Sequence, residues 1–159
     1  MDTKIAALIV WQGKGYVPAH GQVVNGGPFA AVDPVFVIEL DKDELLSAIR
    51  SAMAVGYPPL PNMTPKDWAN RNDPILSATG ARSWKELCRK GASYAITWSA
   101  TYILLDMTRR DRNEKCEYDG ERQRRFPPGT DLEQIVDAIL LDIETRPELK
   151  HVPGQRKRG

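Results

Sequence analysis

The side chains best suited to catalysis are few in this sequence and stand apart from one another. Its two histidines, His20 and His151, lie in a glycine-rich segment and close to the C-terminus, away from any evident nucleophile or carboxylate cluster. Imidazole groups titrate near neutral pH and often act as acids or bases, but they need such neighbours to do so. Cys88 and Cys116 lack the CxxC or CxxH context of a zinc site. The sequence therefore predicts no catalytic residues, no metal site and no enzyme, although folding can still bring separate carboxylates together into a small active site.

Five glycines between residues 13 and 27 are the only feature that resembles a phosphate-binding loop. They form neither GxGxxG nor a P-loop, and no GK[ST] triplet follows them. The pattern is typical of a long turn-rich connection, and we predict that the protein uses no cofactor.

Acidic residues gather on the last predicted helix, over residues 131–144. At 100° per residue, Glu133, Asp137 and Glu144 fall on one side, with Asp131 and Asp142 roughly opposite. A solvated helix face is one reading of this charge. The other is an anionic surface that recognises a basic partner, such as the phosphate-binding cleft of a nuclease. We take all five as candidate partner-binding residues, and add Trp68 from the polar stretch KDWANRND, either as an exposed anchor or as a cover for the core.

Basic residues dominate a second segment, residues 109–125, which holds seven Arg and Lys side chains with Tyr118 and Phe126 nearby. Such a mixture can contact nucleic acid. Five acidic residues interleave with the basic ones, however, which favours a salt-bridged hairpin tip. The C-terminal run Arg156–Arg158 is short, so nucleic-acid binding through these two segments is the alternative function and not the preferred one.

The elements that position these residues follow from apolar periodicity and capping signals. We predict strands at residues 4–11 and 29–40, paired with each other across a loop at 12–28, with Pro34 at an edge or bulge. A helix follows Asp41, and a stiff proline-rich connector spans residues 57–65. Two short helices begin at Asp73-Pro74 and Ser83. In the second, Trp84, Leu87 and Cys88 share an apolar face, and Cys88 is expected to be a core thiol.

A hairpin at residues 93–108 and a further strand near Arg124–Phe126 precede the last helix, for which Thr130 and Glu133 give a capping box. This order predicts the α+β class: a mostly antiparallel sheet with helices packed on one face. The 159 residues suit one domain, residues 1–146, followed by a frayed basic tail at residues 147–159. With 42% hydrophobic residues, a net charge of +1 and no long apolar run, the chain is expected to be cytoplasmic and without a membrane segment.

The stretch ILSATGARSWKELCRKGASYAITW (Ile75–Trp98), preceded by DPVFVIEL and DELLSAIRSAM, resembles the immunity proteins of bacterial contact-dependent growth inhibition systems. Its most specific part is the Gly-x-x-Ser-Trp core at Gly80–Trp84, and the resemblance extends over roughly residues 4–144. It implies a cytoplasmic protein that binds the C-terminal toxin domain of a delivered effector, often a nuclease, and blocks it stoichiometrically. It implies a fold and a partner class but no particular binding residues, because each toxin and immunity pair has its own interface.

Overall fold

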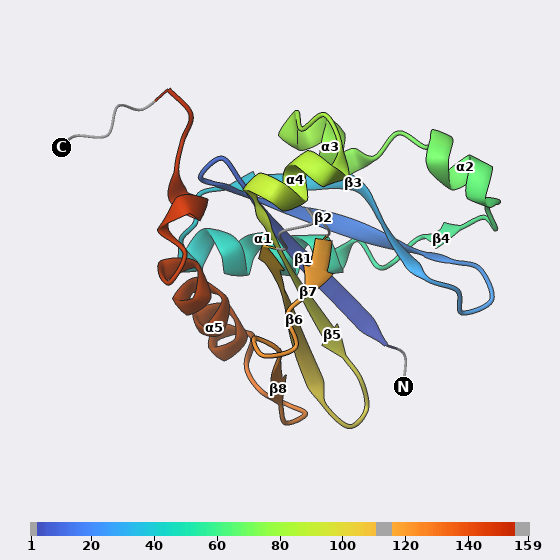
Figure 1. Ribbon diagram of the computed structural model, residues 1–159. Helices are drawn as coiled ribbons and strands as arrows, with labels where there is room; N and C mark the ends of the chain where they lie inside the picture. Colours follow the sequence, from blue (N-terminus) through green and yellow to red (C-terminus); the bar gives the residue numbers. More distant parts are fainter. Residues whose placement is uncertain (1–2, 111–115, 155–159) are drawn as a thin grey trace.

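The computed structural model describes residues 3–110 and 116–154, with the side chains of residues 109, 110, 116 and 117 excepted. Its centre is one sheet with the strand order β3-β2-β1-β5-β6-β7, to which β4 is added beside β2 and β8 beside β6. Every pair is antiparallel except β2 with β4. Helices pack against this sheet (Figure 1), so the α+β class is confirmed.

The first two strands form a hairpin that the sequence did not predict. β1 is Lys4–Trp11, as expected, but β2 (Lys14–Val23) occupies most of the segment that we predicted to be a loop. Gln12 and Gly13 make the tight turn between them, with φ values of 50° and 77°. Gly21 lies within β2 and not in a turn. It is glycine because a Cβ there would lie 2.8 Å from the carbonyl oxygen of Pro58. Strand glycines that permit close packing were therefore mistaken for turn signals.

β3 (Phe29–Ile38) is the edge strand of the sheet, as Pro34 indicated. It pairs with β2, so the predicted direct pairing of residues 4–11 with 29–40 is wrong. The register jumps between Pro18 and Ala19 of β2, which leaves Asp33 and Pro34 of β3 without partners and forms the expected bulge. The short β4 (Pro59–Leu60) lies within the proline-rich connector.

Two helices of thirteen residues cover one face of the sheet. α1 (Lys42–Ala54) begins where Asp41 accepts a hydrogen bond from the Glu44 backbone N–H at 2.9 Å, as its capping spacing predicted. α5 (Leu132–Glu144) does not use the predicted capping box, because the helix begins one residue later and Asp131 is its N-cap; the Thr130 hydroxyl donates to Pro127 O. Both helices bury their apolar stripes, Leu45 and Ile49 in α1 and Ile135 and Ile139 in α5, in the larger core.

The shorter helices are α2 (Pro65–Asn70), α3 (Pro74–Thr79) and α4 (Trp84–Lys90). α3 and α4 pack on the opposite face of the sheet, where Ile75 and Leu87 join Ile9 and Trp11 in a second core. The two long helices thus share one face as predicted, while these two cover part of the other. No helix was predicted at α2, which stands apart from the other helices (Figure 1) and buries none of its residues.

The second half of the sheet follows the prediction closely. β5 (Ala92–Trp98) and β6 (Ile103–Arg110) form the expected hairpin, and β8 (Arg124–Phe126) adds to β6. β7 (Cys116–Tyr118) pairs with the far end of β6. From residue 116 onward the Arg-rich segment is therefore a strand–turn–strand unit, with a turn in which Asp119 O accepts from the backbone N–H groups of Arg122 and Gln123.

Two further expectations need correction. The tail does not fray at residue 147, because Pro147–Lys150 forms a 3-10 helix, η1, and Leu149 is 3% exposed in the larger core. Cys88 is buried as expected, but it is disulfide-bonded and not a thiol. The sequence contains one other cysteine, Cys116, and α4 lies in contact with β7, where Cys116 is the first residue. Neither cysteine lies in a sequence pattern that predicts a disulfide.

Candidate functional site

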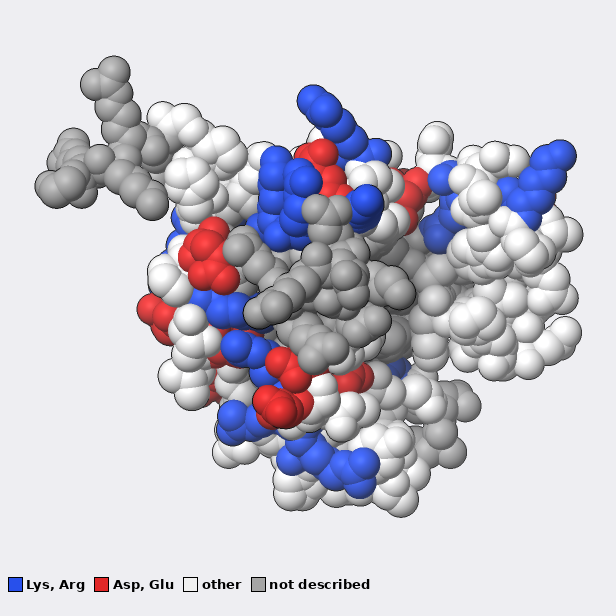
Figure 2. Space-filling view, viewed as in Figure 1, with Lys and Arg blue, Asp and Glu red and all other residues white. Residues whose placement is uncertain are grey.

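The acidic residues of α5 lie beside basic residues from other elements. Glu133 pairs with Arg50 at 2.9 Å and Asp137 with Lys42 at 3.0 Å, so α1 supplies both partners. Glu144 pairs with Lys150 of η1. Figure 2 shows acidic and basic side chains interleaved over the part of the molecule where α5 lies. The three carboxylates predicted on one side of the helix, the acidic edge of Glu133, Asp137 and Glu144, are thus at least partly exposed, but each is balanced by a basic residue within the protein. Asp131, predicted roughly opposite them, is the exposed N-cap residue of α5.

Asp142 is different, because only 10% of its side chain is exposed and it lies at the centre of a polar network. One carboxylate oxygen accepts from the Tyr94 hydroxyl at 2.7 Å and from Arg146 Nη2 at 2.6 Å. The other accepts from Arg122 Nη1. Arg146, itself buried, also donates to Thr108 O at 2.9 Å, so the network joins α5 to β5 and β6.

The electrostatics of this network give Asp142 a structural role. Burial raises the pKa of Asp142, but the hydrogen bond from Tyr94 and the Arg146 guanidinium outweigh burial, and the pKa lies below its ordinary value. Burial and the hydrogen bond to Asp142 raise the pKa of Tyr94, so its phenol stays protonated. Asp142 is thus committed to internal contacts and contributes little to the accessible acidic edge.

Trp68 lies at a groove of about 460 Å³ on the open part of the sheet, the face that α3 and α4 leave partly uncovered. Small strand residues form its floor, among them Ala7, Ala31 and Ala95. The side chains at its rim are larger and come from α2, α4, three strands and the connection between α2 and α3. They are His20, Phe29, Trp68, Arg71, Asp73, Trp84 and Tyr118. We call this set of floor and rim residues the open-face groove.

Polar contacts fix several rim residues. The Trp84 indole N–H donates to Asp73 Oδ2 at 2.5 Å, and Asp73 also caps α3 by accepting from the Ile75 backbone N–H at 2.8 Å. Arg71 lies 5.5 Å from the centre of the Trp68 ring and donates to Ala31 O. These contacts hold Trp68 and Trp84 at the rim of the groove.

The comparisons with known proteins bear on the fold only. The sequence matches no protein-family model and no curated protein. Among solved structures, a protein of unknown function from Neisseria meningitidis has a TM-score of 0.62 at 12% identity, and the match covers 91% of this chain and 95% of that one. A chain of a CdiA-CT/CdiI toxin and immunity complex from Yersinia pseudotuberculosis has a TM-score of 0.53 at 11% identity, with 91% and 97% covered. This chain therefore shares its fold with a chain of a toxin and immunity complex.

The open-face groove includes residues that the sequence analysis placed elsewhere. Trp84 was assigned to the core, yet it is 38% exposed. It is the first residue of α4, directly after the N-cap Ser83. His20 was expected in a solvated loop, but it lies on β2 opposite Ala31. No local pattern relates Phe29 and Tyr118 to the two tryptophans, since only the sheet brings their strands together.

Burial lowers the pKa of His20 to about 4. In the unfolded chain the His20 imidazole takes up a proton near pH 6.5, whereas in the folded protein it stays neutral until about pH 4. The contribution of His20 to the free energy of unfolding is therefore fully present above pH 6.5 and is lost as the pH falls towards 4. We expect wild type to lose on the order of 2 kcal/mol more than His20→Gln between about pH 7 and about pH 4.5, measured by urea denaturation. His151→Gln, at an exposed position, serves as the control. Equal losses in wild type and His20→Gln would contradict a buried neutral imidazole.

The described part of the Arg-rich segment is largely engaged within the protein. Arg122 pairs with Asp119 at 3.3 Å and with Asp142, and the Arg125 guanidinium lies 4.5 Å from the Tyr102 ring centre. Arg124 is exposed. Arg112, Lys115 and the tail residues Arg156–Arg158 lie outside the described residues. The ion pairs of Arg122 are of the kind expected for a salt-bridged hairpin, whereas Arg125 stacks on an aromatic ring; the tip of the predicted hairpin lies outside the described residues.

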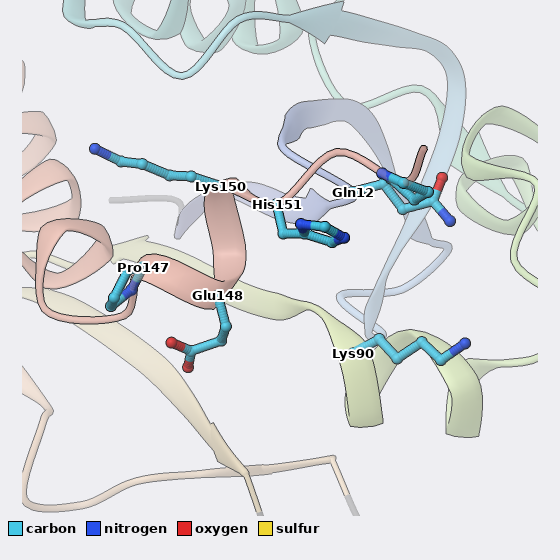
Figure 3. Close-up of a pocket in the computed structure, with 7 residues that line it drawn as sticks. Gln12, Lys90, Pro147, Glu148, Lys150 and His151 are labelled. Carbon is cyan, nitrogen blue, oxygen red and sulfur yellow. The ribbon is translucent and has the colours of Figure 1, made fainter. Parts of the chain in front are cut away.

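A pocket of about 810 Å³ lies between the β1–β2 turn, the end of α4 and η1. Figure 3 shows that the charged groups of Lys90, Glu148 and Lys150 point in different directions and do not converge on one place. His151 also lines this pocket. Across residues 3–110 and 116–154, no group of three or more His, Cys, Asp or Glu side chains is placed to hold a metal ion. None of the helices found there has the length and apolar character to span a membrane.

Proposed function

We propose that this protein binds the toxin domain of a contact-dependent growth inhibition effector and neutralises it by stoichiometric occlusion, without catalysis and in the cytoplasm. The observation that carries the proposal is the shared fold with a chain of the CdiA-CT/CdiI complex, which extends over 91% of this chain. The resemblance at Gly80–Trp84 supports it, since Gly80 caps α3 with a φ of 75° and Ser83 caps α4. These two caps set the α3–α4 pair on the sheet beside the open-face groove.

The open-face groove is the surface that we assign to the toxin. Aromatic residues bury large areas at low conformational cost and dominate the energies of protein interfaces. Trp68 and Trp84 stand on separate elements at the rim, and an alanine floor between them leaves room for side chains of a partner. Trp68 is on a helix with no buried residue, so α2 contributes little to the core and is available for contact.

The acidic edge of α5 is proposed to act at long range. Glu133, Asp137 and Glu144 form an anionic surface that suits a basic toxin, such as a nuclease with a phosphate-binding cleft, and Asp131 adds a further exposed carboxylate at the start of the helix. Basic groups of such a partner compete with Arg50, Lys42 and Lys150 for these carboxylates. Because the competing ion pairs are exposed and weak, we expect steering of the encounter and little binding energy.

The decisive experiment is reconstitution with the C-terminal domain encoded directly upstream of this gene. A tight 1:1 complex in solution, together with restored growth of cells that express the toxin domain, would support the proposal. A well-folded protein that neither binds this domain nor restores growth would overturn it.

Charge reversal on α5 tests the steering role. We expect Glu133→Lys with Asp137→Lys to slow association with the toxin domain by about threefold to tenfold at low salt and to leave the dissociation rate nearly unchanged. The change in thermal stability should be small, because both ion pairs are exposed. Glu39→Lys is the matched control, since Glu39 forms an exposed pair with Lys14 away from α5. An association rate equal to that of wild type would contradict a steering role for α5.

A further inference from the structure

A second pocket, of about 530 Å³, opens at the end of the larger core and shares no lining residue with the open-face groove. It lies where the end of α1, the start of α5, the β5–β6 connection and the first residue of β1 meet. Its lining residues are Lys4, Met53, Trp98, Ser99, Ala100, Ile103, Pro128, Gly129 and Leu132. We call it the end pocket.

The lining of the end pocket is mostly apolar. Met53, Trp98 and Leu132 come from three different elements, and each is partly exposed while it packs against the larger core. The Ser99 hydroxyl is a neutral polar group that could contact a ligand, but it is already hydrogen-bonded within the protein. It donates to Tyr102 O at 3.0 Å and accepts from the Tyr102 backbone N–H at 3.3 Å. The volume and the apolar walls are those of a site for a small organic molecule.

Lys4 is the single charged residue in this lining. It lies opposite Trp98 in the β1–β5 register, and Trp98 lies opposite Ile103 in the β5–β6 register, so the three side chains form one row on the same face of the sheet. The Lys4 side chain is exposed, and no carboxylate pairs with it among the residues that the structure describes. An ammonium group at the mouth of an apolar pocket complements a ligand with one negative charge at the end of an apolar body.

We propose that the end pocket binds an amphiphilic monocarboxylate, with the alkyl or aryl body between Trp98, Met53 and Leu132 and the carboxylate at Lys4. Each part of the ligand has a counterpart: apolar walls from the ends of α1 and α5 replace water around the body, and Lys4 Nζ donates to the anionic head. The end pocket shares no lining residue with the open-face groove, so this proposal does not depend on toxin binding.

Calorimetric titration of the full chain with dodecanoate, below its micellar concentration, tests the proposal. We expect saturable 1:1 binding, and binding of the matched cation dodecyltrimethylammonium weaker by about tenfold or more. Lys4→Glu should weaken dodecanoate by about tenfold while improving the cation. Ala100→Trp, at an exposed position in the pocket wall, should abolish binding of both by filling the pocket.

Matched controls come from α2, where Lys66 and Ala69 are also exposed. Lys66→Glu and Ala69→Trp make the same changes of charge and size outside the end pocket, and both should bind dodecanoate as wild type does. No saturable binding of dodecanoate to wild type would overturn the proposal. Equal affinity for the carboxylate and the cation would overturn it as well, and so would binding that Ala100→Trp leaves intact.

Discussion

Asp142→Ala is expected to lower the free energy of unfolding by about 3 kcal/mol, because it leaves the buried Arg146 without its carboxylate partner. Asp142 accepts from three side chains, on β5, on the turn before β8 and at the end of α5. Without the carboxylate, the Tyr94 hydroxyl also loses an acceptor in a position where water has little access. Urea denaturation followed by circular dichroism measures this loss.

Asp137→Ala is the matched control, since it makes the same substitution in the same helix. Its pair with Lys42 is exposed, so we expect a change below about 1 kcal/mol. The depressed pKa of Asp142 adds a pH test. Its contribution is present above the ordinary value of 3.8 and is lost as the pH falls through the lower folded value, so wild type and Asp142→Ala should converge in acid. If Asp142→Ala and Asp137→Ala lower the free energy of unfolding equally at neutral pH, the network around Asp142 does not stabilise the fold as described.

Trp68→Ala is expected to weaken binding of the toxin domain by about 2 kcal/mol, roughly thirtyfold in Kd, if Trp68 anchors the partner in the open-face groove. Its partial exposure and its place on α2 mean that truncation removes contact area for a partner without opening the core. Surface plasmon resonance of the purified pair gives the affinity, and most of the change should lie in the dissociation rate.

Val37→Ala controls for the loss of an exposed apolar side chain. Val37 is 55% exposed and does not line the open-face groove, so its truncation should change Kd by less than about twofold. Trp68→Phe keeps an aromatic face at the same position, so it should lose less affinity than Trp68→Ala. Wild-type affinity in a folded Trp68→Ala protein would move the interface away from this groove.

Strong local signals in the sequence determined most of the individual elements. The apolar run over Lys4–Trp11, the Asp41 and Asp73-Pro74 caps, and the apolar stripe of α5 each gave the right element at nearly the right residues. Such signals work because neighbouring residues satisfy the hydrogen bonds of a helix end, and because a repeat of apolar side chains fits only one backbone geometry. The edge position of β3 could also be predicted locally, because Pro34 lacks the N–H that a residue of an inner strand donates to its neighbour.

Where glycine serves packing, the same local reasoning failed. Gly15 and Gly21 indicated a loop, yet they are glycine because Ile38 and Pro58 approach them too closely for a Cβ. That approach depends on β3 and on the connector before β4, which are far along the chain. Thr130 is not the cap because α5 begins at Leu132, which makes Asp131 the N-cap residue, and the Thr130 hydroxyl donates to Pro127 O.

The functional surfaces were decided by the tertiary structure. The sequence placed five acidic residues on α5, but it could not show that α1 supplies Arg50 and Lys42 to two of them, or that Asp142 lies beneath the surface beside Tyr94. It named Trp68 but not the groove, whose rim residues come from five elements (β2, β3, α2, α4 and β7) and from the connection between α2 and α3. Charge and aromatic character are properties of single residues and are visible in a sequence. Which charges remain unpaired, and which rings face one another, depends on contacts between distant segments that only folding makes.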